Sequence, residues 1–114
     1  MENVTRYRQV IHRLLEEYRA FLTELTKTDV ETEILSDDLN GQYMLMRIGW
    51  RAETRVHRPL FYLRLKGGKI YVEEDWTKEG VANELMRAGI PASDIVLAFN
   101  PPELRKETPA FAVA

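Results

Sequence analysis

The chain contains no cysteine, which excludes disulfides, thiolate catalysis and cysteine-based zinc sites. Histidine is scarce: His12 and His57 are far apart and do not have the spacing of metal ligands. No apolar run exceeds five residues, whereas a membrane-spanning helix needs about 20. The first twenty residues are rich in charge and lack the apolar region of a signal peptide. These absences predict a cytoplasmic protein with no membrane segment, no metal site and no cofactor.

Motifs for nucleophilic catalysis and phosphate binding are also missing. Neither Ser36 nor Ser93 lies in the G-x-S-x-G sequence that exposes a catalytic serine. The pair Gly67 and Gly68 lacks the Lys-Ser/Thr pair of a phosphate-binding loop, and it is typical of a two-residue hairpin turn. We therefore expect no catalytic residue and no enzymatic activity.

Three consecutive acids, Glu73, Glu74 and Asp75, are the strongest remaining candidate for chemistry. A nuclease uses two or three carboxylates to hold Mg²⁺. Consecutive residues of a strand point to alternate faces, however, so these side chains converge poorly on one ion. We expect them to end a strand and precede a helix N-terminus, where negative charge is favourable. A small metal-dependent nuclease is the weakest of the three functions that we consider.

Apolar periodicity predicts the secondary structure. Apolar residues at alternating spacings of three and four indicate a helix of about six turns over residues 3–26. Period-two patterns indicate strands over 29–35, 42–51, 54–66 and 69–74, with Pro59 favouring a bulge in the third strand. A second helix follows, which Thr77 can cap and Gly89 can end. Residues 95–99 are expected to be a buried strand or extended segment.

The fold class predicted from this order is α+β. A long N-terminal helix and a shorter second helix would pack on an antiparallel, mostly meander sheet of about four to five strands. With 114 residues, of which 45% are apolar and 30% charged, the chain fits a single domain over residues 1–114.

Basic residues concentrate in the middle of the chain. Residues 42–69 hold seven basic residues and one acid, although the net charge is −2. Arginine interleaved with aromatic rings on a sheet is one way to hold single-stranded nucleic acid. The predicted partner or nucleic-acid surface consists of Tyr43, Arg47, Arg51, Tyr62, Arg64 and Lys66. The same pattern is compatible with an acidic protein partner, or with a solvated surface that neutralises itself.

The last residues are apolar for a free tail. Phe111 and Val113 follow two proline breaks, so we expect the tail to pack on its own domain or on a neighbouring copy. In the second case these two residues would be the contact of a homodimer.

The C-terminal half is similar to the XisI family. The resemblance rests on Gly68-Lys69-Ile70, on Glu79-Gly80-Val81-Ala82 and, most of all, on Ala88-Gly89-Ile90-Pro91 followed by residues 94–103. Val56-His57 and the ending Phe111-Ala112-Val113-Ala114 agree with it. The likeness covers nearly the whole chain, although the segment Arg105-Lys106-Glu107 is more charged than the family pattern.

The resemblance implies a function that the residues alone do not give. XisI-like proteins occur mainly in cyanobacteria, where they are named controlling factors for excision of the fdxN element during heterocyst development. The resemblance therefore implies a non-enzymatic regulator of DNA rearrangement whose partner is a XisH-like protein, with the excision recombinase as a further candidate. The alternative is an accessory nucleic-acid-binding module that uses the basic strand face. No binding or catalytic residue carries over from the family.

Overall fold

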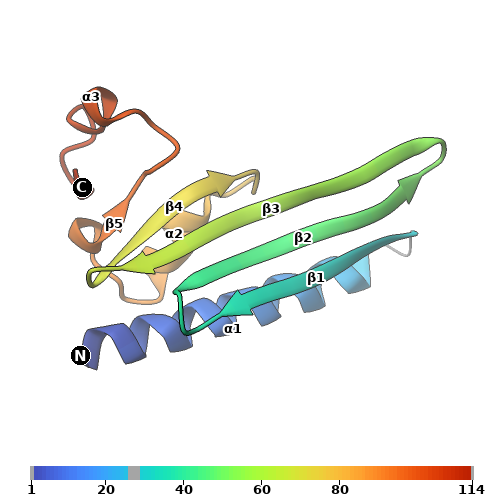
Figure 1. Cartoon of the computed structure of the whole chain (residues 1–114), viewed down its shortest axis with the longest axis horizontal. Helices are drawn as coiled ribbons and strands as arrows, with labels where there is room; N and C mark the ends of the chain where they lie inside the picture. The colour runs from blue at the N-terminus through green and yellow to red at the C-terminus, as the bar shows by residue number, and fades with distance from the viewer. Residues whose placement is uncertain (1, 26–28, 114) are drawn as a thin grey trace.

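A long helix crosses one face of a sheet in the computed structural model, which describes residues 2–25 and 29–113 (Figure 1). The helix α1 spans Glu2–Leu25. Its predicted apolar stripe faces the sheet, because Tyr7, Ile11 and Leu15 are almost completely buried. The predicted helix is thereby confirmed, while its predicted last residue, Thr26, lies outside the described residues.

The five strands lie side by side in the order of the sequence. They are β1 (Val30–Asp37), β2 (Gln42–Arg51), β3 (Thr54–Lys66), β4 (Lys69–Asp75) and β5 (Ile95–Val96). The first four form an antiparallel meander, and β5 pairs in parallel with β4. This confirms the predicted α+β fold and places β1 at an edge of the sheet.

A bulge in β3 changes which side chains face α1. Leu45 pairs with Phe61 and Met46 pairs with Pro59, so Leu60 is an extra residue with no partner on β2. The extra residue shifts the alternation of β3, and Phe61 and Leu63 both become fully buried under the helix. The irregularity expected at Pro59 is present, with the inserted residue next to the proline.

The second helix, α2, is shorter than its sequence suggested. It spans Val81–Arg87, so the prediction that Thr77 caps it is wrong. Gly80 occupies the N-cap position, and the carboxylate of Asp75 accepts a hydrogen bond of 2.8 Å from the first helical N–H. The predicted end is confirmed: Gly89 has a φ of 97°, and the N–H of the next residue bonds back to the helix.

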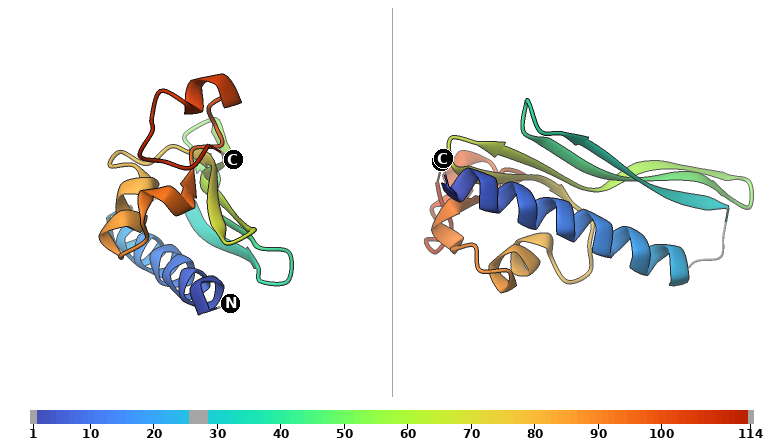
Figure 2. Two further views of the ribbon diagram at one scale, coloured as in Figure 1. Left: turned by 90° about the vertical axis from the view of Figure 1, so that its left-hand side faces the viewer. Right: turned by 90° about the horizontal axis from the view of Figure 1, so that it is seen from below.

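Both longer helices cover the same face of the sheet and leave the other face open (Figure 2). A 3₁₀ turn (Ala92–Asp94) precedes β5, and a short helix, α3 (Pro102–Arg105), follows it. The β2–β3 hairpin reaches well past β4, because β4 pairs with β3 only over Phe61–Lys66 (Figure 1). No helix of the described residues is long and apolar enough to cross a membrane.

Candidate functional site

The three consecutive carboxylates at the end of β4 contact different parts of the chain. Glu73 lies 3.6 Å from the guanidinium of Arg64, and Glu74 accepts a hydrogen bond of 2.6 Å from the indole of Trp76. Asp75 accepts hydrogen bonds from the backbone N–H and the hydroxyl of Thr77. The contacts of Glu74 and Asp75 hold the β4–α2 connection, whereas that of Glu73 joins β4 to β3. No group of three or more potential metal ligands occurs among the described residues.

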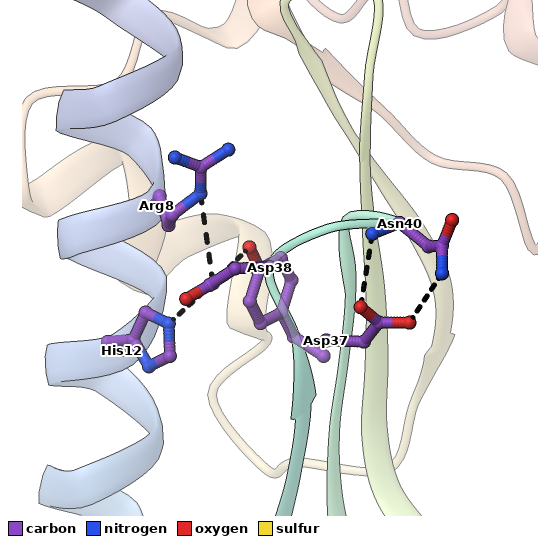
Figure 3. Close-up of polar contacts among 6 residues, drawn as sticks. Arg8, His12, Asp37, Asp38 and Asn40 are labelled. Carbon is purple, nitrogen blue, oxygen red and sulfur yellow. Dashed lines mark hydrogen bonds and ion pairs between the residues drawn. The ribbon is translucent and has the colours of Figure 1, made fainter.

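A second polar cluster joins α1 to the β1–β2 turn (Figure 3). Asp38 accepts a hydrogen bond of 2.8 Å from the hydroxyl of Tyr43, and it lies 2.8 Å from the Nε2 atom of His12 and 3.7 Å from the Nε atom of Arg8. Hydrogen bonds from His12 and Tyr43 hold the pKa of Asp38 below its ordinary value. Next to it, Asp37 accepts two hydrogen bonds from Asn40 and shapes the turn. The cluster therefore fixes the position of the helix on the sheet.

The residues predicted to form one basic surface lie on two opposite faces of the sheet. Arg47 pairs with Arg58 and lies on the face that carries α1, whereas Arg64 pairs with Gln42 and lies on the open face. The expectation of a shared surface is wrong because the bulge at Leu60 reverses the alternation between Arg58 and Arg64. Tyr43 is fully buried beneath α1, so its ring is not part of a surface.

On the open face, each predicted residue already has a partner. The hydroxyl of Tyr62 donates a hydrogen bond of 3.0 Å to Gln42. Arg64 is paired with Glu73, and the ammonium of Lys66 lies 5.9 Å from the centre of the ring of Tyr71. Arg64 is thus ion-paired within the chain, and Lys66 contacts an aromatic ring of the neighbouring strand.

On the helix side of the hairpin, the cations have no acidic partner. Arg47, Arg51 and Arg58 line a cleft of about 360 Å³ together with Arg55 and other residues of the hairpin; we call it the guanidinium cleft. No ion pair between these arginines and a described carboxylate is present, and the Nε and Nη2 atoms of Arg47 are buried without a hydrogen-bond partner. Burial, and then the charges of Arg51 and Arg58, lower the pKa of Arg47.

An apolar groove lies next to this cleft. The groove has a volume of about 530 Å³ between the C-terminal half of α1, the bulge of β3 and the β4–α2 connection. Its apolar lining consists of Leu14, Tyr18, Phe21, Leu22, Leu60 and Trp76. Leu60 also lines the guanidinium cleft, and Arg58 of the cleft lies 5.4 Å from the centre of the ring of Trp76. The groove and the cleft therefore adjoin at Leu60.

Sequence reasoning found part of this site and missed the rest. Arg47 and Arg51 were named, but Arg58, Phe21 and Trp76 were not. The alternation of apolar residues in β3 could have indicated Arg58. Val56 and Phe61 are separated by an odd number of positions and both lie on the helix side, so the alternation must change between them and Arg58 faces α1 with Val56. Trp76 and Phe21 carry no comparable signal, because their neighbourhood depends on how α1 crosses the sheet.

The C-terminal tail packs on its own chain. Phe111 contacts the hydrophobic core, and the N–H of Ala112 donates a hydrogen bond of 2.9 Å to the carbonyl of Ile95. Arg105 holds the segment by donating to the carbonyl oxygens of Asn100 and Ala98. Val113 remains half exposed. The first of the two arrangements expected for the tail is thus present, and a dimer contact through Phe111 and Val113 stays a prediction.

Comparison with known proteins gives a consistent result. The sequence matches the XisI protein family over residues 1–113. The fold is similar to the crystal structure of a XisI-like protein from Anabaena variabilis, with 30% identity, a TM-score of 0.88 and coverage of 97% of this chain and 99% of that one. It is also similar to the crystal structure of fdxN element excision controlling factor XisI from Anabaena variabilis, with 34% identity, a TM-score of 0.80 and coverage of 98% and 99%.

No curated protein matches the sequence. The family match nevertheless spans almost every residue, and both crystal structures are covered over nearly their full length. The chain belongs to the XisI family.

Proposed function

We propose that this chain is a non-enzymatic regulatory protein of the excision-controlling type, which acts in the cytoplasm by binding a partner protein. The observation that carries the proposal is the likeness to fdxN element excision controlling factor XisI, at 34% identity over 98% of the chain. The local contacts of Glu73, Glu74 and Asp75 support the non-enzymatic part, since Glu73 pairs with Arg64 of β3 and the other two carboxylates stabilise the β4–α2 connection.

The partner that we propose is a XisH-like protein, with the excision recombinase as a second candidate. Two features of the surface support a role in protein binding. Trp50 and Trp76 are more than half exposed, and each has an arginine stacked on its ring. Tryptophan and arginine are the residues most enriched at the energetic centres of protein interfaces.

Co-purification tests the proposal directly. The tagged chain would be co-expressed with an untagged XisH-like protein from the same genome, and the complex would be isolated by affinity and then by gel filtration. We expect a complex of defined stoichiometry that survives 0.5 M salt. Failure to co-elute with either the XisH-like protein or the recombinase would contradict the proposal.

A second assay addresses the absence of catalysis. The purified chain would be incubated with plasmid and single-stranded DNA in the presence of Mg²⁺, and a parallel sample would contain a chelator. We expect no cleavage in either sample. Cleavage that requires Mg²⁺ and disappears in Asp75→Ala would establish the nuclease hypothesis instead.

A further inference from the structure

We propose that the guanidinium cleft and the apolar groove form one binding site for an acidic segment of a partner protein. The segment would place an apolar side chain in the groove and its carboxylates on Arg47, Arg51 and Arg58. The inference rests on the proposed function for taking a protein as the occupant. The two halves are joined, because Leu60 lines both and Arg58 stacks on Trp76 of the groove.

The need for an anion comes from Arg47. Two of its nitrogen atoms are buried without a hydrogen-bond partner, while Arg51 and Arg58 add like charge from the same side. A partly buried charge without an acidic partner is unfavourable, and a bound carboxylate would supply both the missing acceptor and the missing countercharge. The planar guanidinium favours a carboxylate in particular, because it can form two parallel hydrogen bonds with it.

The apolar half is open to an anchor side chain. Phe21 is 57% exposed and Trp76 is 58% exposed at the rim of the groove. Large apolar side chains that remain this exposed and face one hollow are typical of an interaction surface. An aliphatic or aromatic anchor would remove both from water, which is the usual source of affinity at an interface.

The charges around the groove favour a protein segment over nucleic acid. Glu17, Glu79 and Glu84 line the groove next to its apolar floor, together with one cation, Lys78. Glu17 and Glu84 are ion-paired with Arg13 and Arg87, and Glu79 adds a further negative charge. A nucleic-acid strand leaving the guanidinium cleft along the groove would bring its phosphates against these carboxylates. A peptide with an uncharged anchor followed by acids matches the order of the surface, which runs from the groove to the arginines.

The test uses two synthetic peptides and one oligonucleotide. One peptide, blocked at both ends, has two leucines followed by an aspartate-rich segment, and the other replaces every aspartate with asparagine. The oligonucleotide is a short oligothymidylate. Trp50→Phe leaves Trp76 as the single fluorescent reporter at the groove, so binding can be followed by its emission and checked by calorimetry.

We expect the acidic peptide to bind at least tenfold more tightly than its amide counterpart. Arg47→Met and Arg58→Met should each weaken binding of the acidic peptide about tenfold, since each removes a charge-assisted hydrogen bond. Arg64→Met is the matched control: it removes the same charge on the open face and should change binding less than twofold. Phe21→Ala should weaken both peptides equally.

Three outcomes would overturn the inference. These are equal affinity for the two peptides, no binding of the acidic peptide at millimolar concentration, and tighter binding of oligothymidylate with the same loss in Arg47→Met. The proposed function is judged separately by co-purification of the unaltered chain. If the Arg47→Met/Arg58→Met double variant still co-purifies with the XisH-like protein as strongly as the unaltered chain, the inference fails and the proposed function stands.

Discussion

Replacing Arg47 with methionine should make the free protein more stable, which is an unusual expectation for a partly buried residue. The Nε and Nη2 atoms of Arg47 are buried without a hydrogen-bond acceptor, and burial and the charges of Arg51 and Arg58 lower its pKa. An unsatisfied buried donor costs about 1–3 kcal/mol, and more when it is charged. Methionine keeps an unbranched stem in the same place and carries no charge.

The net gain should be about 1–2 kcal/mol. The estimate stays at the lower end of the range because Arg47 as a whole is only partly buried and because methionine does not replace all of the packing of the arginine side chain. For a chain of this length, a change of 1 kcal/mol moves the melting temperature by about 4 °C. Arg47→Met should therefore melt about 4–8 °C above the unaltered protein.

Urea unfolding followed by circular dichroism would measure this change, with the slope against urea expected to remain constant. Arg64→Met is again the control, because Arg64 is already paired with Glu73 and its removal should be neutral or cost up to about 1 kcal/mol. If Arg47→Met loses stability while Arg64→Met does not, the guanidinium is satisfied in solution and the argument for an anionic partner fails.

Three other expectations concern the fold. Gly41→Ala should lower the free energy of unfolding by more than about 1–2 kcal/mol, because the residue has a left-handed backbone and its new Cβ would lie 2.3 Å from a carbonyl oxygen of β3. Gly67→Ala is the control, because Gly67 has a φ of 60° and open space around it. Burial, the hydrogen bond to Asp94 and the charge of Asp94 raise the pKa of Tyr7 to about 12. Stability that is present below about pH 10 should therefore fall as the pH rises through 12, and Tyr7→Phe should make that fall smaller. Deleting residues 109–114 should cost roughly 1–3 kcal/mol in urea unfolding, because a partly buried phenylalanine leaves the core. An unchanged elution volume on gel filtration of the shortened chain would refute a dimer contact through this tail.

The sequence predicted α1, α2 and the first four strands, although not the short α3, because each of the predicted elements carries its own local signal. The spacing of Tyr7, Ile11 and Leu14 is enough to indicate α1. The glycine pair at Gly67 and Gly68 is enough to place the β3–β4 turn. These signals come from residues near one another in the chain, so they indicate the local structure without knowledge of the tertiary fold.

The start of α2 could not be predicted in the same way. Threonine is a residue type favoured at N-cap positions, which is why Thr77 was predicted to cap α2. In the structure its hydroxyl donates a hydrogen bond to Asp75 and accepts one from the N–H of Gly80. Asp75 then reaches the N–H of Val81, six residues further along. Several side chains compete for the same backbone donors, and composition does not determine which of them wins.

The face of each arginine could not be read from the pattern because a single inserted residue decides it. The hairpin pairs Arg51 with Thr54, and an unbroken register from that point would place Arg47, Tyr62 and Arg64 on the same face. Leu60 interrupts the register, so the apolar side chains of the distal half of β3 face α1 while Arg64 turns to the open face. The predicted surface would have been correct for a β3 without its bulge.

The two faces of the sheet also differ in how their arginines are paired. On the open face, a register shift between β3 and β4 leaves Glu73 as an extra residue of β4, and its carboxylate forms an ion pair with Arg64. On the helix side, the hairpin extends beyond β4, and no described carboxylate forms an ion pair with Arg47, Arg51 or Arg58. The unpaired arginines therefore lie in the part of the hairpin that extends past β4, and Arg58 among them contacts the exposed ring of Trp76 at the groove. A partner that binds there would cover apolar surface and neutralise charge at the same time, and both effects would contribute to its affinity.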